Sequence, residues 1–409
     1  MEHVLTAEFF QGNRERLRQL FTGTAPIVIT AHAQLQQSAD EAYPFRQDSS
    51  FYYLTGVTDP GVVLVMDKTK EYLIVPPREV VIEQFDGVID PVQLARVSGI
   101  QTVVTQKEGW RMLSTRLKKS AHVATLGAAP RYIEYLGMYT NPARADLIAQ
   151  MKEINPKLEL LDLRTHLSRM RMVKQPAEIE VIKRAIEVTC STIKTITRPS
   201  KLVKYANEYE IEAELTYGFR RQGAPHAFHP IVSSGKNTCT MHYLKAESPL
   251  KSGELLLLDV GAEYEFYASD IARTMSLGGN PTRRQKQVYD AVLDVQEYAF
   301  TLLKPGVVLQ EYEQQIENYM GEKLRELGLI KTITSDAVRQ YFPHRTSHFL
   351  GLDTHDAGDY EHPIEPGVII TVEPGIYIPE EGIGIRIEDD VLITVDGIEN
   401  LSAGLPRAL

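Results

Sequence analysis

Short apolar runs alternate with stretches of helical periodicity over about the first 160 residues of the chain. Runs rich in β-branched and aliphatic residues predict strands at Ile27–Thr30, Gly61–Met66, Tyr72–Val75, Val103–Thr105 and His122–Leu126. Apolar residues at helical spacing predict helices at Glu8–Phe21 and Gly109–Lys119. Helices and strands that alternate in this way are typical of an α/β unit.

The pattern changes around Arg169–Pro176. Proline at the first position and Glu178 in the first turn form the signature of a helix N-terminus. Apolar residues then follow at helical spacing, at Ile179, Ile182, Ala185, Ile186 and Val188. Because 409 residues exceed one ordinary domain, we predict two domains, residues 1–168 and 169–409.

Helical periodicity returns twice in the second domain. One helix is predicted at Tyr209–Arg221, and a longer helical stretch covers Arg283–Leu303 and Tyr312–Leu327. Strand-rich sequence follows each helical part, so helices followed by strands occur twice. This order hints at an internal duplication, although the two halves share little sequence. The predicted fold class of the whole chain is α/β (α+β).

The composition excludes several classes of protein. With 43% hydrophobic and 24% charged residues, the chain is globular and can build a core of normal size. Its net charge of −10 has the opposite sign to that of proteins that grip nucleic-acid phosphates. The N-terminus lacks the continuous apolar segment of a signal peptide, and no apolar run is long enough to cross a bilayer. Two cysteines, Cys190 and Cys239, are too few for a disulfide scaffold. We therefore expect a cytoplasmic protein that binds neither nucleic acid nor membrane.

A first acidic hairpin is predicted after the apolar run Leu255–Gly261. A tight turn between Tyr264 and Glu265 would reverse the chain and set Asp259 directly opposite Asp270. Directly opposed residues on antiparallel strands have Cβ atoms about 5 Å apart. Two ionised carboxylates at that separation in apolar surroundings repel each other. Either one of them is protonated, or a cation lies between them.

A second segment repeats this arrangement. The apolar strand Ile369–Gly375 contains Glu373, and a turn between Glu380 and Glu381 would set Glu373 opposite Glu388. Two prolines make this ladder imperfect. A single acid would be read as a solvated turn or edge residue, but four acids in two apolar hairpins indicate a site for a divalent ion that prefers oxygen ligands.

Three histidines, His344, His348 and His355, lie within twelve residues. A single histidine is more often a packed or surface residue than a ligand, but a cluster of three favours function. The segment is not a zinc-protease helix, because Arg345 follows the first histidine where that motif requires glutamate. We therefore expect the cluster to contribute ligands to the carboxylate site.

These residues resemble a known family. The set Asp259, Asp270, His348, Glu373 and Glu388 resembles the five-ligand pattern of the pita-bread metallopeptidases, which include aminopeptidase P, prolidase and methionine aminopeptidase. The order of the five and their contexts agree: Leu-Asp-Val-Gly, Ser-Asp-Ile-Ala-Arg-Thr, Ser-His-Phe-Leu-Gly, Val-Glu-Pro-Gly and Arg-Ile-Glu-Asp. Within the family, the stretches Tyr43–Gly56 and His348–Asp356 are most similar to aminopeptidase P. The similarity covers nearly the whole chain.

The resemblance implies a creatinase-like N-terminal domain followed by a pita-bread catalytic domain. It also implies two divalent metal ions, with Mn²⁺ favoured and Co²⁺ or Zn²⁺ as alternatives. By position, Asp270 and Glu388 would bridge the ions, Asp259 would bind one, and His348 and Glu373 would bind the other.

The resemblance assigns roles to residues around this ligand set. His242 and His355 match catalytic histidines, and Arg386 matches a residue that lines the site. His344 matches a histidine near the proline pocket, and Tyr377 matches a position that contacts the substrate. A homodimer or homotetramer, assembled through the N-terminal domain, is what the family suggests.

The implied activity is removal of the residue in front of a proline at the N-terminus of a peptide. Proline lacks an N–H and has a fixed φ, so its peptide bond needs a dedicated pocket. Two cations can hold a water as hydroxide, polarise the scissile carbonyl and hold the free α-amine. Glu373 is the candidate that carries the proton to the proline nitrogen, and His242 and His355 are candidates that stabilise the oxyanion.

Three alternatives compete with this interpretation. A dipeptidase restricted to Xaa-Pro would need a positive group for the proline carboxylate, and Arg386 or Arg345 could supply it. A creatinase-type hydrolase that acts without metal and a non-catalytic peptide-binding module are the other two. The presence of all five ligand positions argues against both of these.

Overall fold

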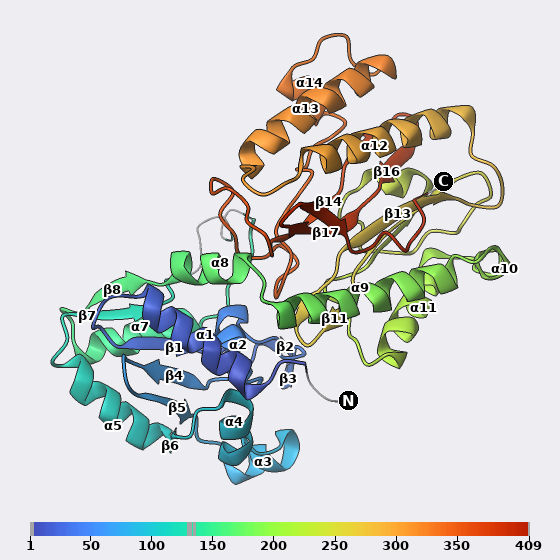
Figure 1. Ribbon diagram of the computed structural model, residues 1–409. Helices are drawn as coiled ribbons and strands as arrows, with labels where there is room; N and C mark the ends of the chain where they lie inside the picture. The colour runs from blue at the N-terminus through green and yellow to red at the C-terminus, as the bar shows by residue number, and fades with distance from the viewer. Residues whose placement is uncertain (1–3, 129–132, 134–135, 408–409) are drawn as a thin grey trace. The chain divides into compact units, whose positions relative to one another are not determined.

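Two structural units, Met1–Met170 and Arg171–Leu409, make up the chain. The computed structural model describes residues 4–128, 133 and 136–407. Each unit combines helices with β-sheets (Figure 1), which confirms the predicted fold class.

The first unit is built on a six-stranded mixed sheet with strand order β6-β5-β4-β1-β7-β8. The strands are β1 (Ile27–Thr30), β4 (Val63–Met66), β5 (Glu71–Val75), β6 (Val103–Thr105), β7 (His122–Thr125) and β8 (Glu159–Asp162), with a separate hairpin of β2 (Gln36–Ser38) and β3 (Glu41–Ala42). The helices are α1 (Ala7–Leu20), α2 (Ser49–Thr55), α3 (Val80–Asp86), α4 (Pro91–Ser98), α5 (Gln106–Leu117), α7 (Ala143–Ile154) and α8 (Arg164–Met172), which runs across the division between the units. All the strands and helices predicted for this part are confirmed, with small shifts at their ends.

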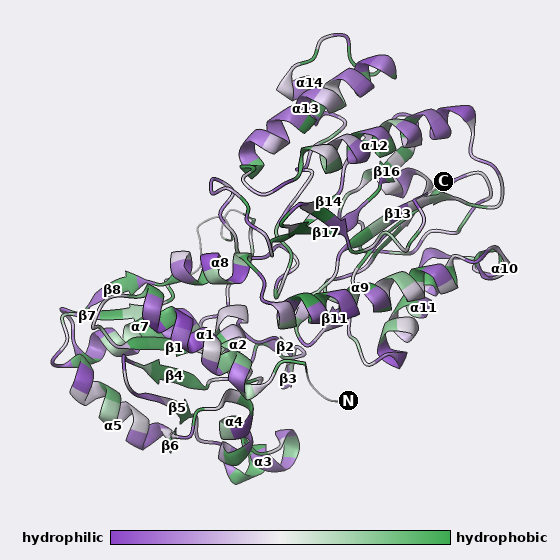
Figure 2. Ribbon diagram, viewed as in Figure 1, coloured by the Kyte–Doolittle hydropathy of each residue, from purple (hydrophilic) through white to green (hydrophobic). Residues whose placement is uncertain are grey.

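The core of the first unit lies between the sheet and its helices. Val28 on β1, Val65 on β4 and Leu113 on α5 belong to one buried apolar cluster. Figure 2 shows β1 and β4 as hydrophobic, whereas α5 carries both hydrophobic and hydrophilic residues. An apolar strand with an amphipathic helix packed on it is the arrangement that the two periodicities predict.

The second unit contains two groups of helices, each followed by strands. The first group comprises α9 (Pro176–Ile196), α10 (Pro199–Leu202), α11 (Glu208–Arg221), β9 (Ile231–Ser234), the 3₁₀ turn η1 (Gly235–Cys239), β10 (Leu255–Val260), β11 (Glu263–Tyr264), β12 (Tyr267–Ala268) and β13 (Ile271–Ser276). The second comprises α12 (Arg283–Leu302), α13 (Leu309–Glu326), α14 (Ser335–Arg339), β14 (Ile369–Val372), β15 (Gly375–Ile378), β16 (Ile383–Arg386), β17 (Asp389–Thr394) and β18 (Gly397–Asn400). The predicted helices of this part, and the repeated order of helices and strands, are confirmed.

Helix α9 begins as its sequence predicts. Pro176 occupies its first turn, and Gln175 and Glu178 form a reciprocal capping box. Its buried face carries Ile182, Ala185 and other apolar residues at helical spacing.

Three small antiparallel sheets carry the site described below. Their strand orders are β13-β10-β9, β14-β17-β18 and β15-β16. Helices α12 and α13 cover the strands on one side (Figure 1), and they share a buried apolar cluster with β14, β15, β16 and β17. The strands thereby bring chain segments more than 100 residues apart side by side.

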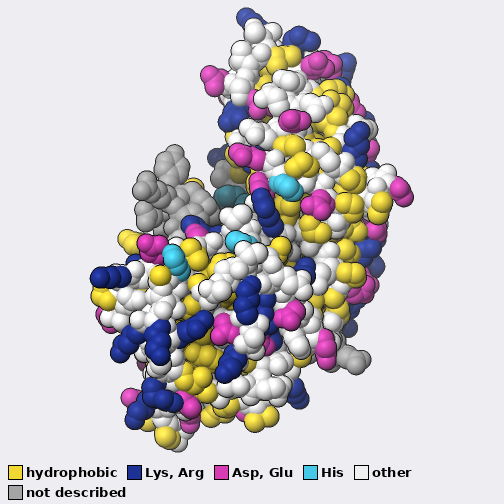
Figure 3. Space-filling view, turned by 60° about the vertical axis from the view of Figure 1, so that its left-hand side comes forward, with side chains coloured by type: hydrophobic (Ala, Val, Ile, Leu, Met, Phe, Trp, Pro, Cys, Tyr) yellow, Lys and Arg dark blue, Asp and Glu magenta, His cyan; other side chains and the backbone are white. Residues whose placement is uncertain are grey.

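The outer surface carries charges of both signs. Figure 3 shows acidic and basic side chains on both units, on the face that it presents. In the described part of the chain, no helix is both long and apolar enough to span a membrane. Cys190 and Cys239 are not joined in a disulfide.

Candidate active site

The first acidic hairpin has a different register from the predicted one. Strands β10 and β13 pair Asp259 with Ala272, so the prediction that Asp259 lies directly opposite Asp270 is wrong. The chain reverses at Glu265 and Phe266, whose φ angles of 44° and 68° suit a two-residue hairpin turn. The turn therefore lies one residue later than predicted, which shifts the pairing by two positions.

This shift leaves both carboxylates on one face of the hairpin. Side chains alternate along a strand with a period of two, so a shift of two positions does not change the face. Asp259 and Asp270 are 6% and 5% exposed. Gly261 permits the close approach of the two chains, because a Cβ at this position would lie 1.7 Å from the carbonyl oxygen of Ser269.

The second acidic hairpin keeps the predicted register. Strands β14 and β17 pair Val372 with Asp389, and β15 and β16 continue in the same register beyond a short break at Pro374. Within this break, the common register of the flanking ladders sets Glu373 opposite Glu388, as predicted. The second pair of acids thus lies in a gap in the backbone ladder.

His348 joins the two hairpins. Its Nδ1 lies 3.0 Å from the carbonyl oxygen of Phe349, which favours the tautomer with the proton on Nδ1. Its Nε2 lies 3.4 Å from Asp270 Oδ2 and 3.5 Å from Glu373 Oε1. The imidazole therefore presents an unprotonated nitrogen to acids from both hairpins, as a metal-binding histidine must.

The donor atoms of Asp270, His348 and Glu388 fit a divalent metal ion. One ligand atom from each lies within 4.8 Å of the other two, and all three residues are buried. Among the described residues, Asp270 Oδ1 and Glu388 Oε2 are buried without a hydrogen-bond partner. Buried carboxylate oxygens require compensation, and carboxylates with one imidazole are ligands that borderline divalent ions accept.

The electrostatics of the group lead to the same conclusion. Burial raises the pKa of Asp270 and of Glu388 well above the usual carboxyl value, and the neighbouring acids raise it further. Burial also raises the pKa of Glu373 to about 8, although Arg386 opposes the shift. Burial lowers the pKa of His348 to about 3. Without a cation, burial thus disfavours the ionised form of these acids and the protonated form of the histidine, whereas a bound cation would favour the ionised carboxylates.

Arg386 and Tyr377 form a polar network beside the acids. The Arg386 guanidinium forms an ion pair with Asp259 and donates from Nε to the Tyr377 hydroxyl at 2.8 Å. The same hydroxyl lies 2.8 Å from His344 Nε2, and His344 Nδ1 lies 3.7 Å from Glu373 Oε2. Tyr377 therefore orients Arg386 and His344.

A cavity of about 790 Å³ opens over the acids. All the predicted site residues except Tyr377 line it: His242, Asp259, Asp270, His344, His348, His355, Glu373, Arg386 and Glu388. The structure thus brings together residues that the sequence separates by more than 140 positions. Tyr377 lies behind the wall and reaches the site through its hydroxyl contacts.

Sequence reasoning missed one wall of this cavity. Phe228, Ile231, Met241 and Leu244 supply apolar surface, and His229 adds a further imidazole. Isolated apolar residues carry no sequence signal that separates a pocket wall from a core. His229 follows His226 by three residues, and this pairing of histidines is the one signal that could have marked the segment.

Ion pairs hold the segment that carries His355. Lys174 Nζ lies 3.2 Å from Asp356, and Arg171 pairs with both Asp356 and Asp353, at 2.6 Å for Asp353. The two acids flank His355, whose ring lies 4.3 Å from that of His348. Cations from the start of the second unit thereby position a predicted catalytic histidine.

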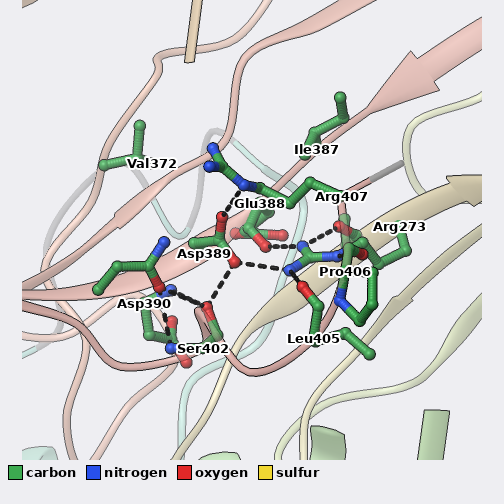
Figure 4. Close-up of polar contacts among 12 residues, drawn as sticks. Arg273, Val372, Ile387, Glu388, Asp389, Asp390, Ser402, Leu405, Pro406 and Arg407 are labelled. Carbon is green, nitrogen blue, oxygen red and sulfur yellow. Dashed lines mark hydrogen bonds and ion pairs between the residues drawn. The ribbon is translucent and has the colours of Figure 1, made fainter. Parts of the chain in front are cut away.

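A buried cluster around Asp389 supports the short segment between β16 and β17 that carries Glu388 (Figure 4). Arg273 Nη2 donates to Asp389 Oδ1 at 2.7 Å, and Nη1 of the same guanidinium donates to the Glu388 carbonyl. Ser402 Oγ donates to the same Asp389 oxygen at 2.6 Å, and Gln296 Nε2 donates to the other at 3.1 Å. Asp389 therefore accepts hydrogen bonds on both oxygens without facing the cavity.

Replacing Asp389 by alanine is expected to destabilise the protein by about 3–5 kcal/mol, because it leaves the buried Arg273 charge without its ionic partner. Urea unfolding in the presence of a chelator measures this change without a contribution from bound metal. The control is Asp396→Ala in the exposed turn between β17 and β18, which should change stability by no more than about 0.5 kcal/mol. Equal stabilities of the two variants would contradict the assignment of Asp389 as a buried support.

Models of known families match both parts of the chain. Residues 10–124 match the aminopeptidase P N-terminal domain, and residues 180–395 match metallopeptidase family M24. The chain is 33% identical to an Xaa-Pro aminopeptidase of Escherichia coli, over 100% of this chain and 97% of that protein. Its structure is similar to that of proline aminopeptidase P II from Yersinia pestis, with a TM-score of 0.84 and 32% sequence identity, over 98% of this chain and 97% of the Yersinia pestis chain. A zinc-substituted E. coli aminopeptidase P in complex with product is 31% identical, with a TM-score of 0.83 over 98% and 96% of the two chains.

Proposed function

Because the chain belongs to metallopeptidase family M24 and carries an aminopeptidase P N-terminal domain, we propose that it hydrolyses the bond between an N-terminal residue and a following proline. The observation that carries this proposal is the buried group of Asp270, His348 and Glu388 at the base of a cavity. Domain boundaries at residues 1–168 and 169–409 are part of the proposal. The family confirms the expected order of a creatinase-like domain followed by a pita-bread domain.

The proposed metal centre holds two divalent ions. Asp270 and Glu388 would help to hold both ions, Asp259 would be a ligand of one, and His348 and Glu373 would be ligands of the other. Mn²⁺ is the favoured ion, with Co²⁺ and Zn²⁺ as alternatives, and the zinc-substituted relative supports a site that accepts more than one metal. When bound, the ions act as Lewis acids toward the scissile carbonyl and lower the pKa of the attacking water.

The residues of the chain supply the remaining steps. Glu373 takes the proton of the attacking water and delivers it to the proline nitrogen, which must be protonated to leave. His242 and His355 donate hydrogen bonds toward the oxygen that develops negative charge. Arg386 and His344, oriented by the Tyr377 hydroxyl, bind the substrate. One side of the cavity is lined by apolar side chains that exclude water, namely Phe228, Ile231, Met241 and Leu244.

The substrates are peptides with proline at the second position. Relatives aligned over the full length are Xaa-Pro aminopeptidases, so the dipeptidase alternative is not favoured. The metal-free hydrolase and the binding module are not favoured either, because all five ligand positions are occupied by suitable residues. A cytoplasmic location and a homodimer or homotetramer complete the proposal.

The test is an assay of the manganese-loaded protein on an Xaa-Pro-Yaa tripeptide, the matching Xaa-Pro dipeptide and an Xaa-Ala-Yaa control. The proposal expects cleavage of the tripeptide in front of proline, loss of cleavage with a chelator, and recovery with added Mn²⁺. Cleavage of the dipeptide alone would support the dipeptidase. Equal cleavage of the proline and alanine peptides would contradict the proposed specificity.

In the metal-free protein, the free energy of unfolding is expected to fall as the pH rises from 6.5 to 8. The pKa of Glu373 is about 8 in the folded protein, against a usual value of 4.5. Between these two pH values the folded metal-free protein binds a proton that the unfolded chain has released, so the folded state loses stability relative to the unfolded state as the pH rises. The pKa of His344 and of His348 is lowered to about 3, so these groups raise stability with pH only up to their usual value of 6.5.

Thermal unfolding at a series of pH values, with chelator or with Mn²⁺, measures this dependence. The metal-loaded protein should not show the fall, because a bound cation favours the ionised carboxylates. Parallel curves with and without metal between pH 6.5 and 8 would contradict the raised pKa of Glu373.

A further inference from the structure

The first turn of α11 contains a buried carboxylate that is not part of the candidate active site. Glu208 is 0% exposed and begins the helix, where the partial positive charge of the N-terminus favours an anion. It does not line the cavity over the acids. A buried carboxylate at such a position requires a set of hydrogen-bond donors, and the structure supplies them from a single chain segment.

Each oxygen of Glu208 holds one end of the segment 234–248. Oε1 accepts from Ser234 N at 2.6 Å, from Ser234 Oγ at 2.8 Å and from Asn237 Nδ2 at 3.1 Å. Oε2 accepts from the Tyr243 hydroxyl at 3.0 Å and from Ser248 N at 2.9 Å. One carboxylate therefore closes the segment into a loop whose two ends cannot move independently.

The loop between these anchors carries part of the cavity wall. Met241, His242 and Leu244 line the cavity, and Tyr243 lies between the histidine and the leucine. The His242 side chain is exposed, so packing does little to restrain it. At the start of the loop, Ser234 pairs with Leu256 on β10, the strand that carries Asp259. The bonds of Glu208 thus connect the position of His242 to the strand of a proposed metal ligand.

We propose that Glu208 is a positioning residue for His242, acting through the Tyr243 hydroxyl and the two ends of segment 234–248. This inference rests on the proposed function, because it assigns His242 to the reaction. Each side-chain oxygen of Glu208 accepts from a backbone N–H, Oε1 from Ser234 and Oε2 from Ser248, so both oxygens must act as acceptors. A glutamine has one acceptor oxygen and one NH₂ group, so in either orientation its NH₂ faces the backbone N–H of Ser234 or of Ser248.

The test compares Glu208→Gln and Tyr243→Phe with two matched controls, Glu212→Gln and Tyr217→Phe, both of which lie on α11. Each variant is loaded with Mn²⁺, and kcat and KM are measured on an Xaa-Pro-Yaa peptide. Tyr243→Phe should lower kcat about tenfold with little change in KM, which is the lower end of the loss expected for removal of a supporting hydrogen bond. Glu208→Gln should lower kcat further, by up to about 100-fold. The controls should match the wild type.

A double-mutant cycle separates positioning from a general structural role. If Tyr243 acts through His242, the Tyr243→Phe change should have no further effect on kcat when His242 is already alanine. If the fold reductions in kcat of the two single variants multiplied in the double variant, the proposal would be overturned. A wild-type kcat in Tyr243→Phe would overturn it too. If Glu208→Gln does not fold, the double-mutant cycle still tests the proposal, because the Tyr243→Phe substitution removes only one hydroxyl group.

Hydrogen exchange of backbone amides in segment 234–248 gives a readout that does not depend on activity. Faster exchange in Glu208→Gln than in Glu212→Gln, confined to this segment, is expected. Unchanged exchange would overturn the positioning role. A wild-type protein that cleaves no proline peptide would instead count against the proposed function, and the exchange result would still decide whether Glu208 holds the loop.

Discussion

Glu373→Ala is expected to abolish peptide cleavage and to lower the metal content of the purified protein. The substitution removes a proposed ligand and the proposed proton carrier together, and loss of acid–base catalysis alone lowers rates by about 10²–10⁴-fold. Metal analysis by mass spectrometry and the tripeptide assay measure the two losses. Because burial raises the pKa of Glu373 to about 8, folding keeps this carboxyl protonated at pH values where the unfolded chain would ionise it, and its removal should also relieve this cost in the metal-free protein.

This relief distinguishes loss of a ligand from loss of the fold. The metal-free Glu373→Ala variant should unfold at a temperature no lower than that of the metal-free wild type. Glu361→Ala, at an exposed position outside the cavity, is the matched control and should retain both metal and activity. An unchanged metal content in Glu373→Ala would contradict its role as a ligand.

His242→Ala is expected to leave the metal content unchanged and to lower kcat by about 10²–10³-fold, the usual loss when a group that stabilises an oxyanion is removed. His242 lines the cavity but is not among the three residues whose ligand atoms converge. Metal analysis and steady-state kinetics on the tripeptide check both parts of the prediction.

The matched control is His362→Ala, whose imidazole is partly exposed and lies 3.7 Å from Glu365. This variant should keep wild-type kinetics. Full activity in His242→Ala would show that the oxyanion is stabilised by other groups, with His355 as the next residue to replace. Loss of metal from His242→Ala would instead make this histidine part of the metal centre.

The two acidic hairpins illustrate how far local patterns reach. Apolar runs predicted each strand, and the period of two predicted which acids share a face. The second register was correct: the chain turns at Glu380 and Glu381, and Ile378 pairs with Ile383, which keeps the apolar residues of the two strands facing each other. The first was wrong by two positions, because Glu265 and Phe266 adopt positive φ without a glycine to signal the turn.

The carboxylate network of Glu208 illustrates what local patterns cannot provide. The sequence places this residue in the first turn of a helix, where an acid is ordinary. Its five donors come from a loop that begins 26 residues later in the chain. No periodicity links the two segments, and only the folded structure brings them together.

The sequence by itself predicted most of the central helices and strands, a division into two domains, and the four acids and one histidine that are proposed as metal ligands. These features depend on interactions within a few residues, on the period of the backbone and on motifs that keep their spacing. Only the tertiary structure showed which apolar residues line the cavity and that Arg386 pairs with Asp259. It also showed that Asp389 contacts Arg273 and that Glu208 contacts Tyr243, outside the cavity. Those contacts join residues far apart in the chain, and they form only because burial of the apolar strands and helices brings their polar neighbours within hydrogen-bonding distance.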